Sequence, residues 1–342
     1  MIDIMRKRTS LKDIAVKVGV STALVSYVLN GRMEGRINKD VAQKIRDTAL
    51  KLQYQPNHMA RSLKTNRSGT IGLIVADISN PFSSGLARII EDEADKLGYT
   101  VIFGSSDESE ERSGKLITTL INRQVDGLII LPPDKAEKQI RNLKAQGIPF
   151  VLVDRYFPGI SCDSVCIDNY QAAFDATEHL LSNGRQRIGM IGYRSGLVHL
   201  NDRIEGYRAA LAAKKIRPRK QWLQQVAITN DKLEIETAVQ SLLLPGKQVD
   251  AMLFGSNSIA TAALKYIQSL KIQVPDDLCL VAFDQSDLFD FFYAPLTHVS
   301  QPLMQMGQEA VRLLIETISG KPGPRRLRLP ATLVVRDSSS IN

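Results

Sequence analysis

The chain has 342 residues, of which 44% are hydrophobic and 23% charged, the balance of a globular protein with room for two or three domains. Its positive charge is concentrated at one end. Residues 1–68 carry 14 Lys and Arg against 5 Asp and Glu, whereas residues 69–342 carry 30 against 31. A basic head on a near-neutral body favours a polyanion such as nucleic acid as the partner of the head.

Composition also bears on compartment and cofactors. No run of 18 apolar residues is present, so no transmembrane helix is expected, and the polar N-terminus lacks the apolar stretch of a secretory signal. The cysteines, Cys162, Cys166 and Cys279, are odd in number and have no zinc-binding spacing. We expect free thiols, no metal, no cofactor, no membrane contact and a reducing cytoplasmic location.

Residues 10–54 show three short helical patterns. Ser10 can cap the first helix and Gly19 ends it, while Ser21 and Asn38 can cap the second and third. Two short helices joined by a tight glycine-containing turn predict a helix-turn-helix. The outward face of the second helix is small and polar, which suits entry into a DNA major groove. That face carries Thr22, Ala23, Ser26, Tyr27 and Asn30.

The stretch from Gln55 to Lys64 separates this head from the rest of the chain. Pro56 prevents continuation of the preceding helix, and Asn57 can cap a new helix of about eight residues. Isolated helices below ~12–15 residues are marginal in water, because few hydrogen bonds offset the cost of nucleation. We therefore expect a segment that folds only when something packs against it; a capped linker is the alternative interpretation.

From Thr70 onward, apolar strands alternate with amphipathic helices. This alternation predicts parallel sheets covered on both faces, and seven or more strand–helix units fit two doubly wound lobes better than one. Ligands of such sheets lie at the carboxyl ends of the strands, where Asp77, Asp154-Arg155, Ser256-Asn257 and Asp284-Gln285 fall. The predicted strands are 71–75, 100–104, 127–131, 150–154, 187–192, 250–255 and 278–283, and the predicted helices include 82–97, 115–123, 170–183 and 258–270.

Several motifs carry a family resemblance when they are taken together. They are Leu11-Lys12-Asp13-Ile14-Ala15, Gly19-Val20-Ser21, Val25-Ser26-Tyr27-Val28-Leu29-Asn30-Gly31, Tyr54-Gln55-Pro56-Asn57, Ala60-Arg61-Ser62-Leu63-Lys64, Ile71-Gly72-Leu73-Ile74-Val75, Asp77-Ile78-Ser79-Asn80-Pro81-Phe82, Val125-Asp126-Gly127-Leu128-Ile129 and Val281-Ala282-Phe283-Asp284. With these motifs the chain resembles the LacI family of bacterial transcription regulators over essentially its whole length.

The resemblance implies three parts. They are an all-α helix-turn-helix head over 1–56, a hinge helix and linker over 57–68, and over 69–342 a two-lobed α/β core of doubly wound parallel sheets, similar to periplasmic binding proteins. Lobe 1 is expected to comprise about 69–168 and 300–325, and lobe 2 about 169–299 and 326–342. The chain end lacks the heptads of a tetramerising tail, so we expect a homodimer.

The implied function is repression at a near-palindromic, double-stranded operator. Family positions assign base contacts to Thr22, Ala23 and Tyr27, and Leu63 takes the place of the apolar wedge that opens a base step in the minor groove. Many members have Arg where this chain has Tyr27, and Tyr cannot read guanine bidentately, so a different operator is expected. The expected DNA-contacting residues are Leu11, Ser21, Thr22, Ala23, Ser26, Tyr27, Asn30, Asn57, Ala60, Leu63 and Lys64.

The resemblance further implies a small-molecule effector, a sugar or sugar derivative, in the cleft of the core. Phe82 offers a flat apolar face, and Arg203, expected just before a helix, can grip vicinal hydroxyls together with Asp284. Alternatively, Asp284 can cap a helix, Arg155 can pair with a carboxylate, and His199 can be solvated in a loop over 194–201. The expected effector-binding residues are Phe82, Arg155, His199, Arg203, Asn230, Asn257 (Asp in a typical member), Asp284 and Gln301.

Two alternatives come from other functional classes. An α/β sugar-handling enzyme, such as a kinase or dehydrogenase, would be expected to show GxxxxGK[ST] or GxGxxG after the first strand, and neither occurs. A stand-alone solute-binding protein would need an export signal and would have no use for a basic head. Since neither accounts for residues 1–64, the sequence predicts a DNA-binding regulator rather than an enzyme.

Overall fold

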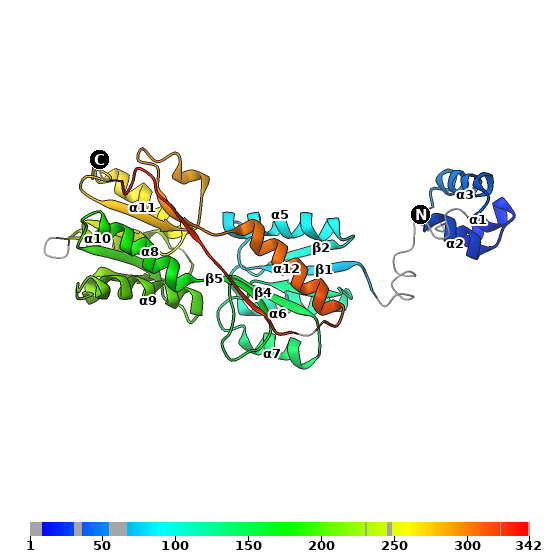
Figure 1. Ribbon diagram of the computed structural model, residues 1–342, viewed down its shortest axis with the longest axis horizontal. Helices are drawn as coiled ribbons and strands as arrows, with labels where there is room; N and C mark the ends of the chain where they lie inside the picture. Colours follow the sequence, from blue (N-terminus) through cyan, green and yellow to red (C-terminus); the bar gives the residue numbers. More distant parts are fainter. Residues whose placement is uncertain are drawn as a thin grey trace, which may run out of the picture. The chain divides into compact units, whose positions relative to one another are not determined.

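The computed structural model describes residues 9–30, 36–54, 67–229, 231–244, 248–321 and 323–340. The chain divides between Asn66 and Arg67 into two compact units, an all-α head and a two-lobed α/β core (Figure 1). This confirms the predicted fold class. The expected hinge helix with Asn57, Ala60, Leu63 and Lys64 lies outside the described residues, as does Asn230.

The described part of the head contains three helices, α1 (Leu11–Val18), α2 (Thr22–Leu29) and α3 (Lys39–Lys51). Ser10 caps α1 and exchanges hydrogen bonds with Asp13 in a capping box, and Gly19 ends the helix with a φ of +79°. Ser21 and Asn38 cap the other two helices, as predicted. The three helices meet in a small core made by Ile14, Ala15, Val25, Val28, Ile45 and Ala49.

Lobe 1 is a six-stranded parallel sheet with helices on both faces. Its elements are β1 (Thr70–Val75), α5 (Pro81–Lys96), β2 (Thr100–Ser105), α6 (Glu110–Asn122), β3 (Gly127–Ile130), α7 (Glu137–Ala145), β4 (Phe150–Val153), β5 (Asp163–Ile167), α12 (Leu303–Ile318) and β11 (Arg326–Leu329). The strand order is β11-β5-β4-β3-β1-β2. Helices α5 and α12 pack against one face, and α6 and α7 cover the other.

Lobe 2 is likewise a six-stranded sheet with helices on both faces. Its elements are α8 (Asn169–Ser182), β6 (Ile188–Tyr193), α9 (Val198–Ala213), η1 (Lys220–Trp222), β7 (Leu223–Val226), α10 (Lys232–Leu243), β8 (Ala251–Phe254), α11 (Asn257–Ser269), β9 (Cys279–Phe283), η2 (Asp287–Phe289), β10 (Thr297–Ser300) and β12 (Thr332–Val334). The order is β12-β10-β9-β8-β6-β7, with β12 antiparallel to β10. Helices α8 and α9 cover one face and α10 and α11 the other.

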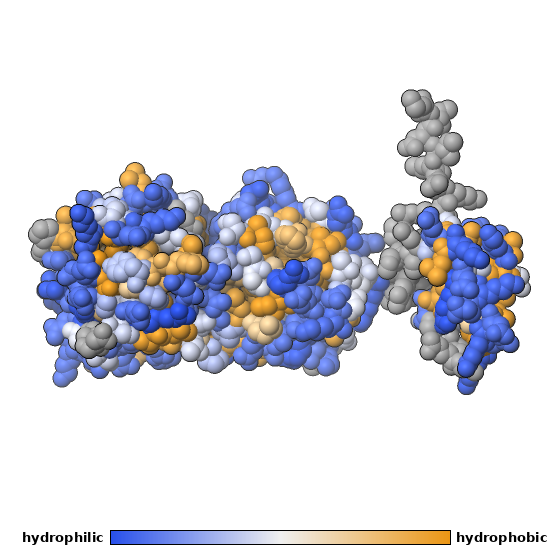
Figure 2. All heavy atoms as spheres, turned by 90° about the horizontal axis from the view of Figure 1, so that it is seen from above, coloured by the Kyte–Doolittle hydropathy of each residue, from blue (hydrophilic) through white to orange (hydrophobic). Residues whose placement is uncertain are grey.

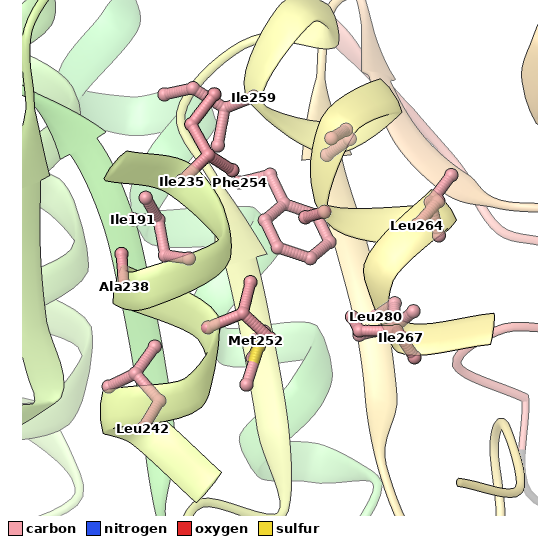
Figure 3. Packing of buried hydrophobic residues seen from close by; sticks show 14 of the residues in the cluster. Ile191, Ile235, Ala238, Leu242, Met252, Phe254, Ile259, Leu264, Ile267 and Leu280 are labelled. Carbon is pink, nitrogen blue, oxygen red and sulfur yellow. The ribbon is translucent and has the colours of Figure 1, made fainter. Parts of the chain in front are cut away.

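The larger core cluster of lobe 2 lies between α10, α11 and the sheet. Figure 3 shows Ile235 of α10 and Leu264 of α11 beside Phe254, which projects from β8. Phe254 is fully buried, as are its neighbours Ile191 and Met252. Each Å² of apolar surface removed from water stabilises the fold by ~25 cal/mol. The packing of this cluster therefore holds in place the sheet whose strand ends line the cavity described below.

The chain crosses between the lobes after β5, after β10 and after β11, and the last crossing is the red segment running across both lobes in Figure 1. The expected boundary at residue 325 is wrong by one strand. Strand β11 pairs in parallel with β5, and its residues Leu327 and Leu329 pack in the lobe 1 core. The final crossing therefore follows Leu329.

All seven predicted strands are present, each within one residue of the expected bounds. Among the described residues, five further strands were not predicted. Strands β7, β11 and β12 lie at sheet edges, and the inner strands β5 and β10 begin with Asp163-Ser164 and Thr297-His298 in place of a continuous apolar run. Helix α6 begins at Glu110 instead of residue 115, since the Ser109 side chain accepts a hydrogen bond from the Arg112 N–H and caps it earlier.

Candidate functional site

The outward face of α2 is the candidate DNA-reading surface. Thr22, Ala23, Tyr27 and Asn30 are exposed, with Tyr27 at 40%, while Val25 and Val28 point into the head core. Ser21 caps the helix, Ser26 is half-buried and Leu11 packs against the head core. The Asn30 amide donates to the Ser26 backbone oxygen at 2.7 Å, so this side chain is held by its own helix. The seven expected head residues thus comprise exposed residues of the outward face and residues that cap the helix or pack against the head core.

The second candidate site is a cavity of about 650 Å³ between the lobes of the core. It is lined by residues that follow β1, β4, β8 and β9, as expected for the carboxyl ends of parallel strands. A second cavity of about 450 Å³ shares three lining residues, Phe82, Asp284 and Gln301, with the first. Of the expected effector-binding residues, the main cavity brings together Phe82, Arg155, His199, Arg203, Asp284 and Gln301.

On the lobe 1 side, Arg155 forms a paired contact with Glu108. Its Nη1 and Nη2 atoms donate to the Glu108 carboxylate at 2.7 and 2.6 Å, and its Nε lies 3.5 Å from Asp154 Oδ2. Although burial alone would lower it, the pKa of Arg155 is raised by Glu108 and Asp154. Burial raises the pKa of Asp154, against the opposing effect of Arg155 and Arg203. The expected alternative, in which Arg155 pairs with a carboxylate of its own lobe, is thus observed within the cavity lining.

On the lobe 2 side, Arg203 is the central cation. It lies within α9, which corrects the expectation that it precedes a helix. Its Nε donates to Asn169 Oδ1 at 2.8 Å, its Nη1 donates to the Gly255 carbonyl at 2.7 Å, and its guanidinium stacks over the Phe283 ring. Asp284 Oδ2 is 3.7 Å from Arg203 Nη1. Arg203 is therefore held in one position from several sides before any ligand binds.

The two lobes place equivalent carboxylates at the cavity. Asp154 follows β4 and Asp284 follows β9, and these strands occupy corresponding places in the two sheet orders. Both residues have a φ of +65°, a left-handed conformation that aspartate tolerates better than most residues. Gln301 Nε2 donates to Asp284 Oδ1 at 2.6 Å. A ligand in the cavity thus meets this pair of equivalent carboxylates, one from each lobe, among the acidic residues of the lining.

His199 is buried, with 4% of its surface exposed, in the first turn of α9, so the alternative interpretation, a solvated position in a loop, is wrong. Its Nε2 lies 3.9 Å from Asp154 Oδ2. Burial, reinforced by Arg155 and Arg203, lowers the pKa of His199 well below its usual 6.5. The imidazole ring is therefore neutral at pH 7. Helix α9 holds His199 in this buried position because the neighbouring residue, Leu200, packs in the lobe 2 core.

Four residues of the cavity lining carry a buried polar atom that has no hydrogen-bond partner among the described residues. These atoms are Asp154 Oδ1, Arg155 Nε, His199 Nδ1 and Gln301 Oε1. Leaving a buried donor or acceptor unpaired costs about 1–3 kcal/mol. A mixed set of donors and acceptors beside the aromatic face of Phe82 is suited to a ligand with several hydroxyl groups.

Asn257 does not line either cavity. Its amide Nδ2 donates to Asn80 Oδ1 at 3.0 Å, and Asn80 Nδ2 lies 3.3 Å from Asn257 Oδ1, which joins the lobes directly. A second cross-lobe contact is made by Asp134, which accepts from the Ser195 hydroxyl at 3.0 Å and the Gly196 N–H at 2.9 Å. The expected effector contact at Asn257 thus has a structural role in this conformation.

Reasoning from the sequence placed Asp154 at a strand end where ligands lie, but did not include it among the expected effector-binding residues. It did not select Glu108, Asn80 or Asn169. Asn80 carries a signal, because Asn-Pro at the end of a strand is typical of a helix start, and Asn80 does cap α5. Glu108 and Asn169 reach the site through contacts with Arg155 and Arg203 that no local pattern indicates.

Within the described ranges, no group of three or more His, Cys, Asp or Glu side chains could hold a metal ion. No described helix has the length and apolar character needed to cross a membrane. The three cysteines are free thiols, with Cys162 half-buried and Cys166 and Cys279 buried.

Comparison with known proteins matches both units. Residues 10–57 match the model of bacterial regulatory proteins of the lacI family, and residues 177–339 match a periplasmic binding protein-like domain. The ribose operon repressor of Halalkalibacterium halodurans is 34% identical over 97% of both chains, and the transcriptional repressor CytR of Escherichia coli is 32% identical over 96% of both. Among solved structures, the complex of the transcriptional regulator CelR with cellobiose superposes with a TM-score of 0.72 at 27% identity, over 97% of this chain and all of the other.

A two-lobed ligand-binding core behind a helix-turn-helix head defines a class of ligand-responsive transcription factors. The chain belongs to the LacI family of bacterial regulatory proteins. It is a DNA-binding transcriptional repressor, and its relatives are regulators rather than enzymes.

Proposed function

We propose that this repressor binds its operator under the control of a small polyhydroxylated molecule, a sugar or sugar derivative, held between the lobes of the core. The observation that carries this proposal is the meeting, in one cavity, of Asp154 from lobe 1 with Arg203 and Asp284 from lobe 2. Carboxylate and guanidinium groups bind vicinal hydroxyls by charge-assisted hydrogen bonds. A relative named for the ribose operon and a solved regulator bound to cellobiose support this ligand class.

The position of the ligand between the lobes would couple effector binding to operator binding. A ligand that touches both lobes stabilises the closed form by its differential affinity for that form. Closure changes the spacing of the segments that lead from the core to the head, and with it the ability of two heads to engage one operator. Whether the ligand is an inducer or a corepressor follows from which form binds the operator.

The test of the ligand class is a thermal-shift screen of pentoses, hexoses, disaccharides and nucleosides against the purified full-length protein. We expect at least one neutral compound with vicinal hydroxyls to raise the unfolding temperature in a concentration-dependent manner. That compound should then change operator affinity in the same preparation. If no such compound shifts the unfolding temperature, the proposed ligand class is wrong.

For the operator, we propose that Thr22, Ala23 and Tyr27 contact base edges. Near these, Ser21 and Asn30 would contact phosphates, and Leu63 would open the central base step. Replacing Thr22 or Ala23 should change sequence preference, whereas Lys64→Ala should weaken binding to all sequences alike. Leu63→Ala should reduce operator binding sharply and leave non-specific binding nearly unchanged.

The contribution of the basic head can be measured as the salt dependence of DNA affinity. With 14 Lys and Arg residues in 1–68, used twice in a dimer, many phosphates are neutralised, so affinity should fall steeply as salt rises. Site selection from random DNA should return a near-palindrome whose half-sites lie about one helical turn apart. Recovery of sites without two-fold symmetry would contradict the dimeric head.

We also propose that the chain forms a homodimer through its core. Figure 2 shows apolar patches on one face of both lobes, and large exposed apolar side chains of the core include Phe103, Phe291 and Tyr293. Contiguous exposed apolar surface marks interaction sites in soluble proteins. Analytical ultracentrifugation at micromolar concentration should give a dimer; a monomer or tetramer would contradict this.

A further inference from the structure

The lining of the main cavity contains more acidic than basic side chains. Its lining contains five carboxylates, Asp77, Asp107, Glu108, Asp154 and Asp284, against two guanidinium groups, Arg155 and Arg203. Asp107 is paired with Arg112, which does not line the cavity. Since burial keeps His199 neutral, the site offers no third cation, and a ligand that carries a phosphate meets an excess of negative charge.

Both guanidinium groups are also occupied. Arg155 is held by the two carboxylate oxygens of Glu108, in a pair whose side chains are only 11% and 19% exposed. Arg203 is fixed by Asn169, the Gly255 carbonyl and the Phe283 ring, near Asp284. An anionic ligand would have to displace Glu108 from a paired, largely buried contact before it reached the Nη1 and Nη2 atoms of Arg155. The remaining donor, Nε, lies 3.5 Å from the Asp154 carboxylate.

The backbone holds Glu108 in this position. The residue lies in the connection between β2 and α6, where Asp107 and Glu108 have φ angles of +47° and +56°. Its N–H donates to the Ala76 carbonyl at 2.9 Å, which ties the connection to the end of β1. Two successive non-glycine residues in the left-handed region persist only where the surroundings fix them, so the Glu108 side chain is a built part of the cavity wall.

We infer that Glu108 is a specificity-determining residue, which occupies Arg155 so that the cavity accepts a neutral polyhydroxylated ligand and rejects its phosphate ester. This inference rests on the proposed ligand class, and it adds a direction of selectivity that the ligand class alone does not contain. Neutral hydroxyls can bind the free polar atoms of Asp154, His199 and Gln301 without disturbing the Arg155–Glu108 pair.

The experiment compares matched pairs by thermal shift and isothermal calorimetry on the full-length chain. The pairs are D-ribose and ribose 5-phosphate, D-glucose and glucose 6-phosphate, and adenosine and adenosine 5′-monophosphate, with inorganic phosphate as a separate probe at fixed ionic strength. The variants are Glu108→Gln, the double variant Glu108→Gln/Arg155→Gln, and Glu110→Gln as a control. Glu110 begins α6, lies outside both cavities, and loses the same charge.

In the wild type, we expect neutral members to bind and every phosphorylated member and inorganic phosphate to bind at least tenfold more weakly. Glu108→Gln frees a cationic donor pair, so phosphate-containing probes should gain about ten- to a hundredfold in affinity. The gain should disappear in the double variant and be absent in Glu110→Gln.

Two results would overturn the inference. One is tighter binding of a phosphate ester than of its parent by the wild type, and the other is a folded Glu108→Gln variant with no gain for any phosphate-containing probe. If Glu108→Gln does not unfold cooperatively, the wild-type pairs still decide the selectivity. Failure of all neutral compounds would contradict the proposed ligand class, whereas the inorganic phosphate comparison tests Glu108 independently.

Discussion

Arg203 connects the core of lobe 2 to the cavity, since one side chain contacts Asn169, the Gly255 carbonyl and the Phe283 ring while it faces Asp284. We expect Arg203→Ala to weaken effector binding by ~1.5–3 kcal/mol, roughly ten- to a hundredfold, because a charged partner of ligand hydroxyls is removed. Operator binding without effector should match that of the wild type. The measurement is operator affinity with and without effector for the wild type and the variant.

Arg208→Ala is the matched control for Arg203→Ala. Arg208 lies on the same helix, is exposed and pairs with Glu205 at the surface, so its removal should leave the effector response intact. Asp284→Ala should reproduce the loss seen for Arg203→Ala. If the effector is an inducer, both cavity variants will repress permanently, and if it is a corepressor, both will be derepressed. Normal responses in both would place the effector site elsewhere.

His199 makes the stability of the core depend on pH. Its pKa is lowered well below 6.5 in the folded protein, so below pH 6.5 the unfolded chain binds a proton that the folded chain does not. Stability should therefore fall as pH decreases from 6.5, by up to ~1.4 kcal/mol per pH unit while the buried ring stays neutral. Denaturant unfolding at pH 7.5 and 5.5 should show a smaller loss for His199→Gln than for the wild type. Equal losses would mean that His199 becomes protonated without unfolding.

At the scale of elements, the contact between α8 and α9 decides where Arg203 lies. Gly206, one turn after Arg203, packs so closely that an added Cβ would overlap the Tyr170 backbone oxygen. Backbone atoms cannot rotate away as a side-chain end can. The close approach brings Asn169, at the start of α8, within hydrogen-bond distance of Arg203.

We expect Gly206→Ala to destabilise the core by about 3 kcal/mol, since overpacking at a backbone contact forces the helices apart. It should also weaken effector binding, because Arg203 moves with α9. Gly85→Ala is the comparison: its Cβ would meet only Leu303 Cδ1 at 3.4 Å, and α5 should gain up to ~1 kcal/mol in helix propensity. Urea unfolding of both variants measures the difference, and similar stabilities would show that α8 and α9 can separate without cost.

At the scale of the whole core, the lobes are joined by direct hydrogen bonds. Asp134 accepts two hydrogen bonds from lobe 2, and Asn80 pairs with Asn257. Although burial opposes the effect, the hydrogen bonds from Gly196 and Ser195 lower the pKa of Asp134, so this contact is present at neutral pH and is lost only as pH falls below the usual value of 3.8. These contacts therefore favour the conformation in which the two lobes meet.

We expect Asp134→Ala to shift the core toward the open form, because two cross-lobe hydrogen bonds worth about 1 kcal/mol each are removed. Small-angle scattering of the variant should show a larger radius of gyration, and its effector affinity should fall severalfold. Lys138→Ala, an exposed substitution on α7, is the control and should match the wild type. An unchanged radius together with unchanged affinity would mean that Asp134 does not bias closure.

The sequence alone determined the elements whose signals are local. Ser10, Ser21 and Asn38 mark helix starts through hydrogen bonds within three residues, and the Gly19 N–H, which donates to the Ala15 carbonyl, marks a helix end. The starts of the three described head helices and the end of the first could therefore be predicted. The central strands could be predicted as well, because a strand buried on both faces is a continuous apolar run. Edge strands such as β7 and β11 carry no such run, since one side meets solvent, and they form only because a neighbouring strand pairs with them.

Tertiary structure alone decided which hydrogen-bond and ion-pair partners the site residues have. The sequence indicated that Arg155, His199, Arg203 and Asp284 belong near one cavity, through strand ends and family positions, but the partners of these residues lie far along the chain. Glu108 is 47 residues from Arg155, and Asn169 is 34 from Arg203. Such pairs depend on which loops the sheet order brings together, and burial of His199 depends on the packing of α9, so neither has a signal in local spacing.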